Sequence, residues 1–394
     1  MSVDFRQLQE QVRKMGDQAA YWDASRREAN ENAAALLSEF SRDLDGLGQK
    51  LDRAIRFNPN LRCARPLTEP LDGFFSCPDT PANAVIIAAD GSQINPDRHA
   101  QVDFSLINVG AIQMLHGTKE PPAELIFSDL LFDDLRNPSQ AVLSEGLLAL
   151  KRDLFERKVL LNLSQNAPGE PVITFTDGPI ELWNRREPAF EAEFRAAFKD
   201  YIGVLSGLCR LGVATAGYVD RPGANYVVQL LEIGLISDDE IVNLRTVPPK
   251  LAGASDRRLY GKILPPGSRS AVFGLQAKSS DGYDGDLQLH FFYLNVGRAG
   301  SAKIARIEIP AWVAMNKLLL NSLHAVLIDQ SRILGTNAYP YLLHRAHEAA
   351  VVTRSDKDQI IQMILLEWAR RGLAMEDVSE KQRGKDLPGR TRYS

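Results

Sequence analysis

Apolar residues follow a helical spacing in the first part of the chain. Between Phe5 and Phe57 they recur at steps of three and four residues, including Leu36, Leu37, Phe40, Leu44, Leu47 and Leu51. This period predicts one or two long helices, whose apolar face packs on the rest of the protein or forms an oligomer surface. Residues 58–83 are rich in Pro, Cys and Asn and predict a loop, so residues 1–83 form a helical extension and loop.

The pattern changes from helix to strand after this extension. Apolar runs over residues 84–92, 101–115 and 123–132 are separated by short turns and predict three antiparallel strands. A helical pattern over residues 139–163 then leads to another buried strand at 172–177. Because a helix between two strands is a crossover, we expect the strands at 84–92 and 172–177 to be parallel neighbours.

A helix over residues 188–211 and a strand over 213–219 come next. Three antiparallel strands, a helix, a parallel strand, a helix and another strand follow the order of the ribonuclease H-like fold. We therefore predict an α/β protein with a mixed sheet flanked by helices. The rest of the pattern predicts a helix at 222–233, a polar loop at 237–270, strands at 271–276, 287–297 and 303–309, a helix at 312–331 and a final helix opened by Pro340.

Composition narrows the class of protein. The chain has 394 residues, 44% of them hydrophobic and 24% charged, with a net charge of −4, as in an ordinary soluble globular protein. No global basic field marks a nucleic-acid binder, so a phosphate-binding surface must be local. No apolar stretch is long enough to cross a bilayer and no signal peptide is evident, so we expect a cytoplasmic protein without membrane contact. Three scattered cysteines suit reduced thiols.

Two stretches carry the candidate chemistry. Residues 84–92 and 172–180 each contain an apolar strand that ends at an Asp-Gly dipeptide, with Asp90 in the first and Asp177 in the second. If the strands are parallel neighbours, the two carboxylates come close together, and such a pair repels unless a divalent cation lies between them. The alternative interpretation is that both dipeptides are ordinary turns.

Further residues complete an ordered set of motifs. Asp90-Gly91-Ser92 and Asp177-Gly178-Pro179-Ile180 are followed, near the end, by Tyr339-Pro340 with Leu342, Leu343, Ala346 and His347. This set spans residues 85–352 and resembles the NurA nuclease family.

The resemblance implies an activity and partners. It implies a manganese-dependent nuclease with a ribonuclease H-like core, acting as a 5′-to-3′ exonuclease on single- and double-stranded DNA and as an endonuclease on single strands. It also implies a homodimer that works with a HerA-type hexameric ATPase in DNA end resection and repair. By the same resemblance, residues 84–352 form the nuclease domain. Outside the resemblance, we expect residues 353–375 to form a C-terminal helix, and the basic composition of residues 376–394 predicts a disordered tail.

The resemblance also assigns site residues. Asp90 and Asp177 correspond to metal-binding aspartates, and Tyr339 and His347 to the tyrosine and histidine of the last motif. For the family's helical glutamate, Glu156 and Glu145 both stand upstream of Asp177, and Glu156 is preferred. His347 is expected to hold a water or the scissile phosphate and to carry a proton.

The chemistry of phosphodiester hydrolysis agrees with this assignment. The reaction needs neutralisation of a dianionic transition state and an activated water, which two divalent ions about 4 Å apart can supply. Carboxylates are hard oxygen ligands that suit Mn²⁺ or Mg²⁺ rather than zinc.

Contacts to the nucleic acid are expected outside the metal ligands. Ser92 can meet a phosphate or serve the turn, and Arg221 follows the strand at 213–219. Arg257 and Arg258 lie in the most basic local stretch, which is either a solvated loop or the lining of a path for a phosphate backbone. Glu308 alternates with apolar neighbours on a strand, so we expect it to face solvent.

Two other functions fit parts of the pattern. Actin-like ATPases and sugar kinases share the fold, but they need a second glycine-rich phosphate loop and an adenosine pocket, for which the sequence has no motif. A catalytically silent partner-binding protein would use the two Asp-Gly dipeptides as turns, and its activities would not change on replacement of Asp90.

Overall fold

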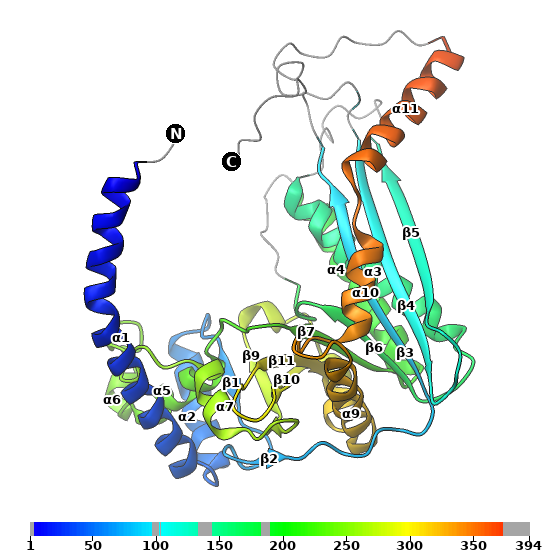
Figure 1. Ribbon diagram of the computed structural model, residues 1–394. Coiled ribbons are helices and arrows are strands. Elements are labelled where there is room, and N and C mark those ends of the chain that lie inside the picture. Colours follow the sequence, from blue (N-terminus) through cyan, green and yellow to red (C-terminus); the bar gives the residue numbers. More distant parts are fainter. Residues whose placement is uncertain (1–3, 97–101, 103, 133–143, 183–189, 373–394) are drawn as a thin grey trace. The chain divides into compact units, whose positions relative to one another are not determined.

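The computed structural model describes residues 4–96, 102, 104–132, 144–182 and 190–372 (Figure 1). Two compact units divide the chain. Unit 1 consists of Met1–Pro81, Asp177–Glu181 and Ala214–Tyr341, and unit 2 of Ala82–Thr176, Leu182–Val213 and Leu342–Ser394. The predicted tail at 376–394 lies outside the described residues.

Unit 2 is built on a four-stranded mixed sheet in the order β6-β3-β4-β5. The strands are β3 (Ala84–Ile94), β4 (Ser105–His116), β5 (Ala123–Leu131) and β6 (Val172–Asp177). β3, β4 and β5 form an antiparallel meander, and β6 joins β3 in parallel after helix α3 (Glu145–Gln165). The ribonuclease H-like order of strands and helices that we predicted is confirmed here. The run of buried residues from Ala84 to Ala89 explains why β3 is an interior strand.

Helices cover both faces of this sheet. Two glycines in neighbouring residue pairs of β3 and β4 indicate which helix lies on each face. A Cβ on Gly91 would meet Arg152 and Glu156 of α3, whereas a Cβ on Gly110 would meet the backbone of α10 (Tyr341–Ala350). Gly110 is paired with Asp90, and neighbouring residues of a strand point to opposite faces. Thus α3 lies on one face of β3–β4 and α10 on the other, as Figure 1 shows. α4 (Glu191–Arg210) packs beside α3.

The last helix of unit 2, α11 (Arg354–Arg370), packs near the start of β4. Its Ile360, Ile361, Ile364, Leu365 and Trp368 contact a cluster made by Val102, Phe104 and Leu106. α11 lies within the expected C-terminal helix at 353–375, whose last residues, 373–375, lie outside the described residues.

Unit 1 contains an antiparallel sheet in the order β1-β9-β10-β11-β7. These strands are β1 (Cys63–Arg65), β7 (Ala214–Val219), β9 (Phe273–Gln276), β10 (Leu289–Asn295) and β11 (Ile304–Pro310), with β2 (Phe74–Phe75) and β8 (Arg269–Ser270) beside β10. The helices are α1 (Phe5–Glu39), α2 (Leu44–Phe57), α5 (Tyr226–Leu235), α6 (Asp238–Ile241), α7 (Asp256–Ile263), α8 (Ala311–Ala314) and α9 (Lys317–Ile333). Every residue of β10 and β11 is buried, so this pair forms the centre of the unit.

Three expectations about local structure are wrong. Asp90 does not end its strand, because β3 continues through Gly91 and Ser92 to Ile94, held by β4. The expected loop at 58–83 contains β1 and β2. The expected loop at 237–270 contains α6, α7 and β8, because Ser237 and Ser255 cap helices that polar composition alone does not reveal.

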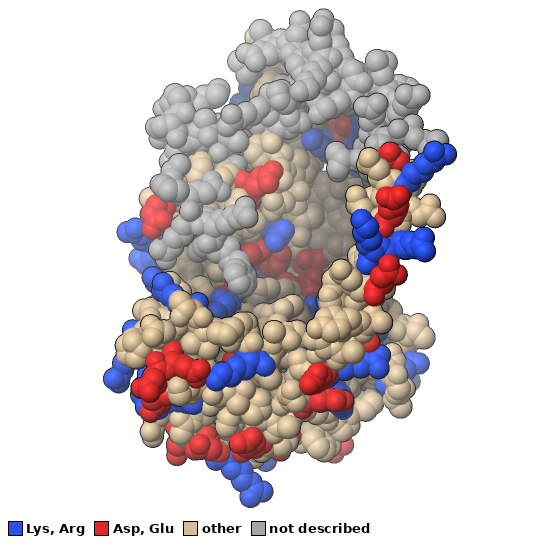
Figure 2. Space-filling model, turned by 90° about the vertical axis from the view of Figure 1, so that its left-hand side faces the viewer, with Lys and Arg blue, Asp and Glu red and all other residues tan. Residues whose placement is uncertain are grey.

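Charge on the surface agrees with the small net charge. Figure 2 shows one face of the molecule, where basic and acidic side chains are interspersed and neither sign covers the face.

None of the helices in the described part of the chain is both long and apolar enough to span a membrane.

Candidate active site

Asp90 and His347 form the central contact of the candidate site. Nδ1 of His347 lies 2.7 Å from Oδ2 of Asp90, although the two residues are 257 positions apart. The Asp90 side chain is 15% exposed and the His347 side chain 66% exposed. The carboxylate therefore fixes the ring of a histidine that stays open to solvent. The other Asp90 oxygen, Oδ1, accepts the Gly91 backbone N–H at 2.9 Å.

Close packing of α10 on β4 produces this contact. A Cβ on Gly110 would lie 2.5 Å from the Ala346 carbonyl oxygen, so only glycine lets the helix approach this closely. The end of α10 is fixed as well, because the Ala350 carbonyl accepts the Ser92 hydroxyl and, at 2.9 Å, the Asn108 amide. Ser92, a predicted phosphate contact, is thus engaged with the helix that carries His347.

Asp177 is the last residue of β6 and is exposed. In the parallel register Ala89 of β3 lies opposite Thr176 of β6. The next residue along each strand is an aspartate, Asp90 in β3 and Asp177 in β6. Gly178 follows with a φ of +89°, a backbone conformation that glycine adopts without strain.

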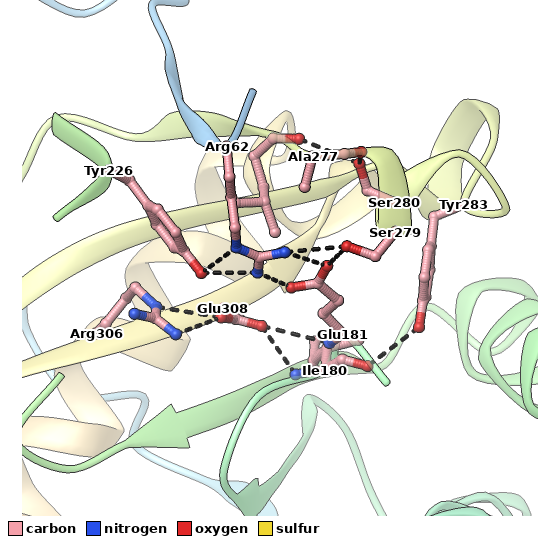
Figure 3. A network of polar contacts seen from close by, with 11 residues as sticks. Arg62, Ile180, Glu181, Tyr226, Ala277, Ser279, Ser280, Tyr283, Arg306 and Glu308 are labelled. Carbon is pink, nitrogen blue, oxygen red and sulfur yellow. Dashed lines mark hydrogen bonds and ion pairs between the residues drawn. The ribbon is translucent and has the colours of Figure 1, made fainter. Parts of the chain in front are cut away.

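The segment after Asp177 is held by a buried polar network in unit 1 (Figure 3). Oε2 of Glu308 accepts the N–H groups of Ile180 at 3.0 Å and Glu181 at 3.4 Å. Oε1 of Glu308 accepts two N–H groups of Arg306, at 2.9 and 3.1 Å. The Glu308 side chain is only 1% exposed, so the expectation that it faces solvent is wrong. Alternation along β11 predicts a half-solvated strand, whereas both faces of β11 are covered.

A second ion pair holds the same segment from the N-terminal extension. Both guanidinium Nη atoms of Arg62 donate to the Glu181 carboxylate, which also accepts the Ser279 hydroxyl. The Tyr226 ring contacts the guanidinium groups of both Arg62 and Arg306, with centroid distances of 5.1 and 4.9 Å. Sequence analysis missed this network, because its members lie on separate elements and share no motif.

Glu156 lies on the α3 face of β3. Its Oε1 would be 2.6 Å from a Cβ on Gly91, so the glycine admits α3 at this point. Arg152, one turn earlier on α3, places its Nε 3.6 Å from the same carboxylate oxygen. The rival candidate Glu145 is exposed in the first turn of α3, which places Glu156 rather than Glu145 against the strand of Asp90.

Burial sets the protonation of this acidic group. Desolvation raises the pKa of Glu156 well above its ordinary value, and the Asp153 carboxylate and, more weakly, Asp90 raise it further against the lowering effect of Arg152. Burial likewise raises the pKa of Asp153, opposed mainly by Arg152, to which it is hydrogen-bonded at 2.8 Å. The acidic side chains near β3 therefore favour a cationic neighbour. Arg152 and Asp153 were not predicted.

The remaining predicted residues gather elsewhere, in unit 1. Arg221, Arg257, Arg258 and Tyr339 line one cavity. The structure thus separates these predicted site residues into two groups. Asp90, Glu156 and His347 lie near β3, whereas the three arginines and Tyr339 lie in unit 1. Among the described residues, no three His, Cys, Asp or Glu side chains already stand together as a metal-binding group.

The fold and this site define an α/β protein in which a mixed sheet and the helices on its two faces contribute carboxylates and a histidine. A family model described as NurA domain matches residues 84–352, and the chain belongs to the NurA family, as the resemblance of its motifs predicted. No curated protein sequence matches the chain.

Several solved structures are similar to this chain. The NurA nuclease from Sulfolobus solfataricus is 11% identical, with a TM-score of 0.46, over 85% of this chain and 96% of that one. A NurA structure bound to dAMP and manganese is 12% identical, with a TM-score of 0.36, over 71% and 87%. Ciona intestinalis endonuclease V in complex with inosine-containing DNA is 11% identical, with a TM-score of 0.34, over 71% and 87%. The family assignment rests on the domain match.

Proposed function

We propose that the protein is a divalent-metal-dependent nuclease that hydrolyses phosphodiester bonds in DNA. Membership of the NurA family supports the reaction class. The observation that carries the proposal is the contact between Asp90 and His347, in a strand whose parallel neighbour ends at Asp177. A carboxylate-bound imidazole with its second nitrogen toward solvent can exchange protons with a substrate.

Asp90, Asp177 and Glu156 are the proposed metal ligands. β6 ends at Asp177, whereas β3 continues to Ile94, and no other strand of the described chain pairs with that edge of β3. We propose that the three carboxylates share a divalent ion at this open edge. The donor set fits a hard divalent ion, because it consists of carboxylate oxygens.

Mn²⁺ is the proposed ion, with Mg²⁺ as the alternative. NurA structures solved with manganese support this choice. An ion bound there would neutralise phosphate charge and lower the pKa of a bound water. Side chains of the protein carry out the proposed proton transfer. Asp90 orients His347 through Nδ1, so the ring exchanges protons through Nε2.

Tyr339 is proposed as the tyrosine of the last motif, in contact with DNA. Its ring is held edge to face by the buried Tyr218, with centroids 5.5 Å apart. Arg221, Arg257 and Arg258 are proposed as phosphate contacts, and their common cavity supports that role.

Finer properties of the activity are proposed from the resemblance. They are 5′-to-3′ exonuclease action, endonuclease action on single strands, cooperation with a HerA-type ATPase and a homodimer. An exposed apolar stripe on α1 supports the dimer, because Phe5, Leu8, Val12, Met15 and Trp22 recur at steps of three, four and seven residues and are all at least 41% exposed. Val12→Asp should then reduce the mass of the particle measured by light scattering, whereas Lys14→Asp should not.

Cleavage assays test the main proposal. Labelled single-stranded DNA is incubated with the full chain and Mn²⁺, with and without EDTA, and with Asp90→Asn or Asp177→Asn. We expect cleavage to need the metal and to be lost in both variants. Asp129→Asn, at an exposed position of β5, is the matched control and should cleave normally. Cleavage that persists in EDTA or in both variants would disprove the assignment.

A further inference from the structure

A cavity in unit 1 brings four separate segments of the chain together. Its volume is about 560 Å³. The wall consists of the turn after β7, one side of α7, the residues that lead into β11 and the residues before α10: Asp220, Arg221, Arg257, Arg258, Gly261, Ala302, Lys303, Ile304, Asn337, Ala338 and Tyr339. A cavity of this size can hold one small ligand or one residue of a polymer.

The charge of the wall is opposite to that of the protein. Arg221, Arg257, Arg258 and Lys303 face a single acidic residue, Asp220, which leaves a net charge of +3 in a chain whose net charge is −4. Cations gathered in one concave site repel one another and attract an anion. The cavity therefore selects an anionic ligand.

The acidic neighbours of these cations do not neutralise them. Asp220 lies 3.6 Å from Arg221, whose side chain is 78% exposed, and Asp23 lies 3.8 Å from Arg258. Exposed pairs at such distances contribute little. Arg257 forms no ion pair with any residue that the structure describes. The guanidinium groups are thus available to bidentate acceptors such as phosphate.

The backbone also holds one of these cations in an uncommon conformation. Arg221 has a φ of +48°, and it is the only non-glycine residue with a positive φ in the described part of the chain. This conformation costs about 1 kcal/mol or more, at a residue that lines the cavity.

The lining also includes apolar and aromatic residues. Tyr339 stands there with Ala338 and Ile304. The Tyr218 ring fixes the Tyr339 ring at an interplanar angle of 87°, so the aromatic surface does not have to be ordered on binding. A fixed ring beside cations suits a ligand that combines phosphate with a flat base.

We propose that this cavity binds one nucleotide of single-stranded DNA, with the flanking phosphates on Arg257, Arg258, Arg221 and Lys303 and the unpaired base against Tyr339. The proposal rests on the proposed nuclease function and adds a subsite that holds the strand without the metal. A base can reach Tyr339 only when it is unpaired, so the subsite distinguishes single-stranded DNA from duplex.

Binding in EDTA tests this subsite without cleavage. The anisotropy of a fluorescein-labelled dT oligonucleotide is measured against full-length protein at several salt concentrations. Arg257→Gln/Arg258→Gln should bind about tenfold more weakly or worse, and the slope of log affinity against log salt should fall by about 1.4, since each phosphate contact on a single strand contributes about 0.7. Lys262→Gln, on α7 but outside the cavity, is the matched control and should bind as the wild type does.

The Tyr339→Leu variant tests the contact with the base independently of the contacts with the phosphates. Loss of the stacking surface should weaken binding of the single strand by about tenfold and leave the salt slope unchanged. It should leave binding of a blunt duplex unaltered. Equal losses for both substrates, or a double arginine variant with wild-type affinity and salt slope, would overturn the proposal. So would tight binding of free dAMP that the oligonucleotide does not displace, because the ligand would then be a mononucleotide.

The outcome is independent of the cleavage assay. If Asp90→Asn abolishes cleavage while the arginine variant binds normally, the nuclease proposal stands and the subsite is wrong. If the wild type does not cleave but the arginine variant loses affinity, the subsite stands and the nuclease proposal is wrong. Lys303→Gln provides a second variant, should the double arginine variant fail to fold.

Discussion

Glu308 accepts the backbone N–H of Ile180 at 3.0 Å, across 128 positions of the chain. Ile180 stands three residues after Asp177, so a buried carboxylate on β11 fixes the course of the chain next to a candidate metal ligand. The same carboxylate is held by Arg306. This relationship makes Glu308 a positioning residue for Asp177.

Glu308→Gln should raise the Mn²⁺ concentration needed for half-maximal cleavage by about 10- to 100-fold, as loss of an outer contact to a metal ligand usually does. It should also lower the free energy of unfolding by about 3–5 kcal/mol, because Arg306 is left buried without its partner. Metal titrations of activity and urea denaturation measure the two effects.

Glu69→Gln is the control for this variant. Glu69 pairs with the buried Arg269 in unit 1 but does not contact the segment after Asp177. The Glu69→Gln variant should lose a similar free energy of unfolding, and the Mn²⁺ concentration that it needs for cleavage should not change. If both variants shift the metal requirement equally, Glu308 acts only through stability.

His347→Ala should lower kcat by about 10²- to 10⁴-fold with little effect on the affinity for DNA, because the ring is proposed to move a proton. His344→Ala, one turn earlier on α10 and without a contact to Asp90 among the described residues, should remain active. Single-turnover cleavage and anisotropy separate the two quantities. Equal losses of turnover and affinity would argue against a chemical role.

Gly91→Ala should disturb the site more than it disturbs the fold. The new Cβ would lie 2.6 Å from Glu156 Oε1 and 2.7 Å from Arg152 Cγ, so these two side chains must move. We expect a loss of about 1–3 kcal/mol in stability and a fall in activity of about 10²-fold. Gly203→Ala on α4, with open space around its Cβ, should be neutral or stabilising. Wild-type cleavage by the Gly91 variant would show that the Glu156 position does not matter.

His324 should make the protein less stable in mild acid. Burial lowers the pKa of His324 to about 4, Arg269 adds to this effect, and the bond to the Gly267 carbonyl opposes it. The unfolded chain takes up this proton near pH 6.5, so stability is full above that pH and is lost as the pH falls toward 4, by about 3 kcal/mol in total.

His324→Gln tests this origin, since glutamine keeps a donor for Gly267 and does not titrate. Urea denaturation at pH 7.5 and pH 5 should then give a smaller difference than in the wild type. His344→Gln, at a partly exposed position, should retain the wild-type difference. An unaltered difference in the His324 variant would place the acid sensitivity elsewhere.

Short-range patterns predicted the strands that carry the aspartates. The β-branched runs before Asp90 and Asp177, with a helix between them, were sufficient for the parallel pairing of β3 and β6. They did not reveal that β3 continues past Asp90, because a glycine after an aspartate is normally a turn signal, whereas here Gly91 makes room for α3.

The sequence pattern did not predict contacts between residues that are far apart in the chain. The resemblance to the family pointed to His347, but nothing in the spacing of α10 indicated that its ring would meet Asp90. Glu308 was misjudged for a related reason: alternation along a strand shows which residues share a face, and it does not show whether another layer covers that face.

Hydrogen bonds to the carbonyl of Ala350 connect the site to the outer strand of the sheet. This carbonyl accepts Asn108, and Asn108 in turn accepts the hydroxyl of Ser128 on the outer strand β5. A chain of three polar groups therefore ties the sheet margin to the helix that carries the imidazole. Variation at Ser128, a position with no chemistry of its own, can tune catalysis from the periphery.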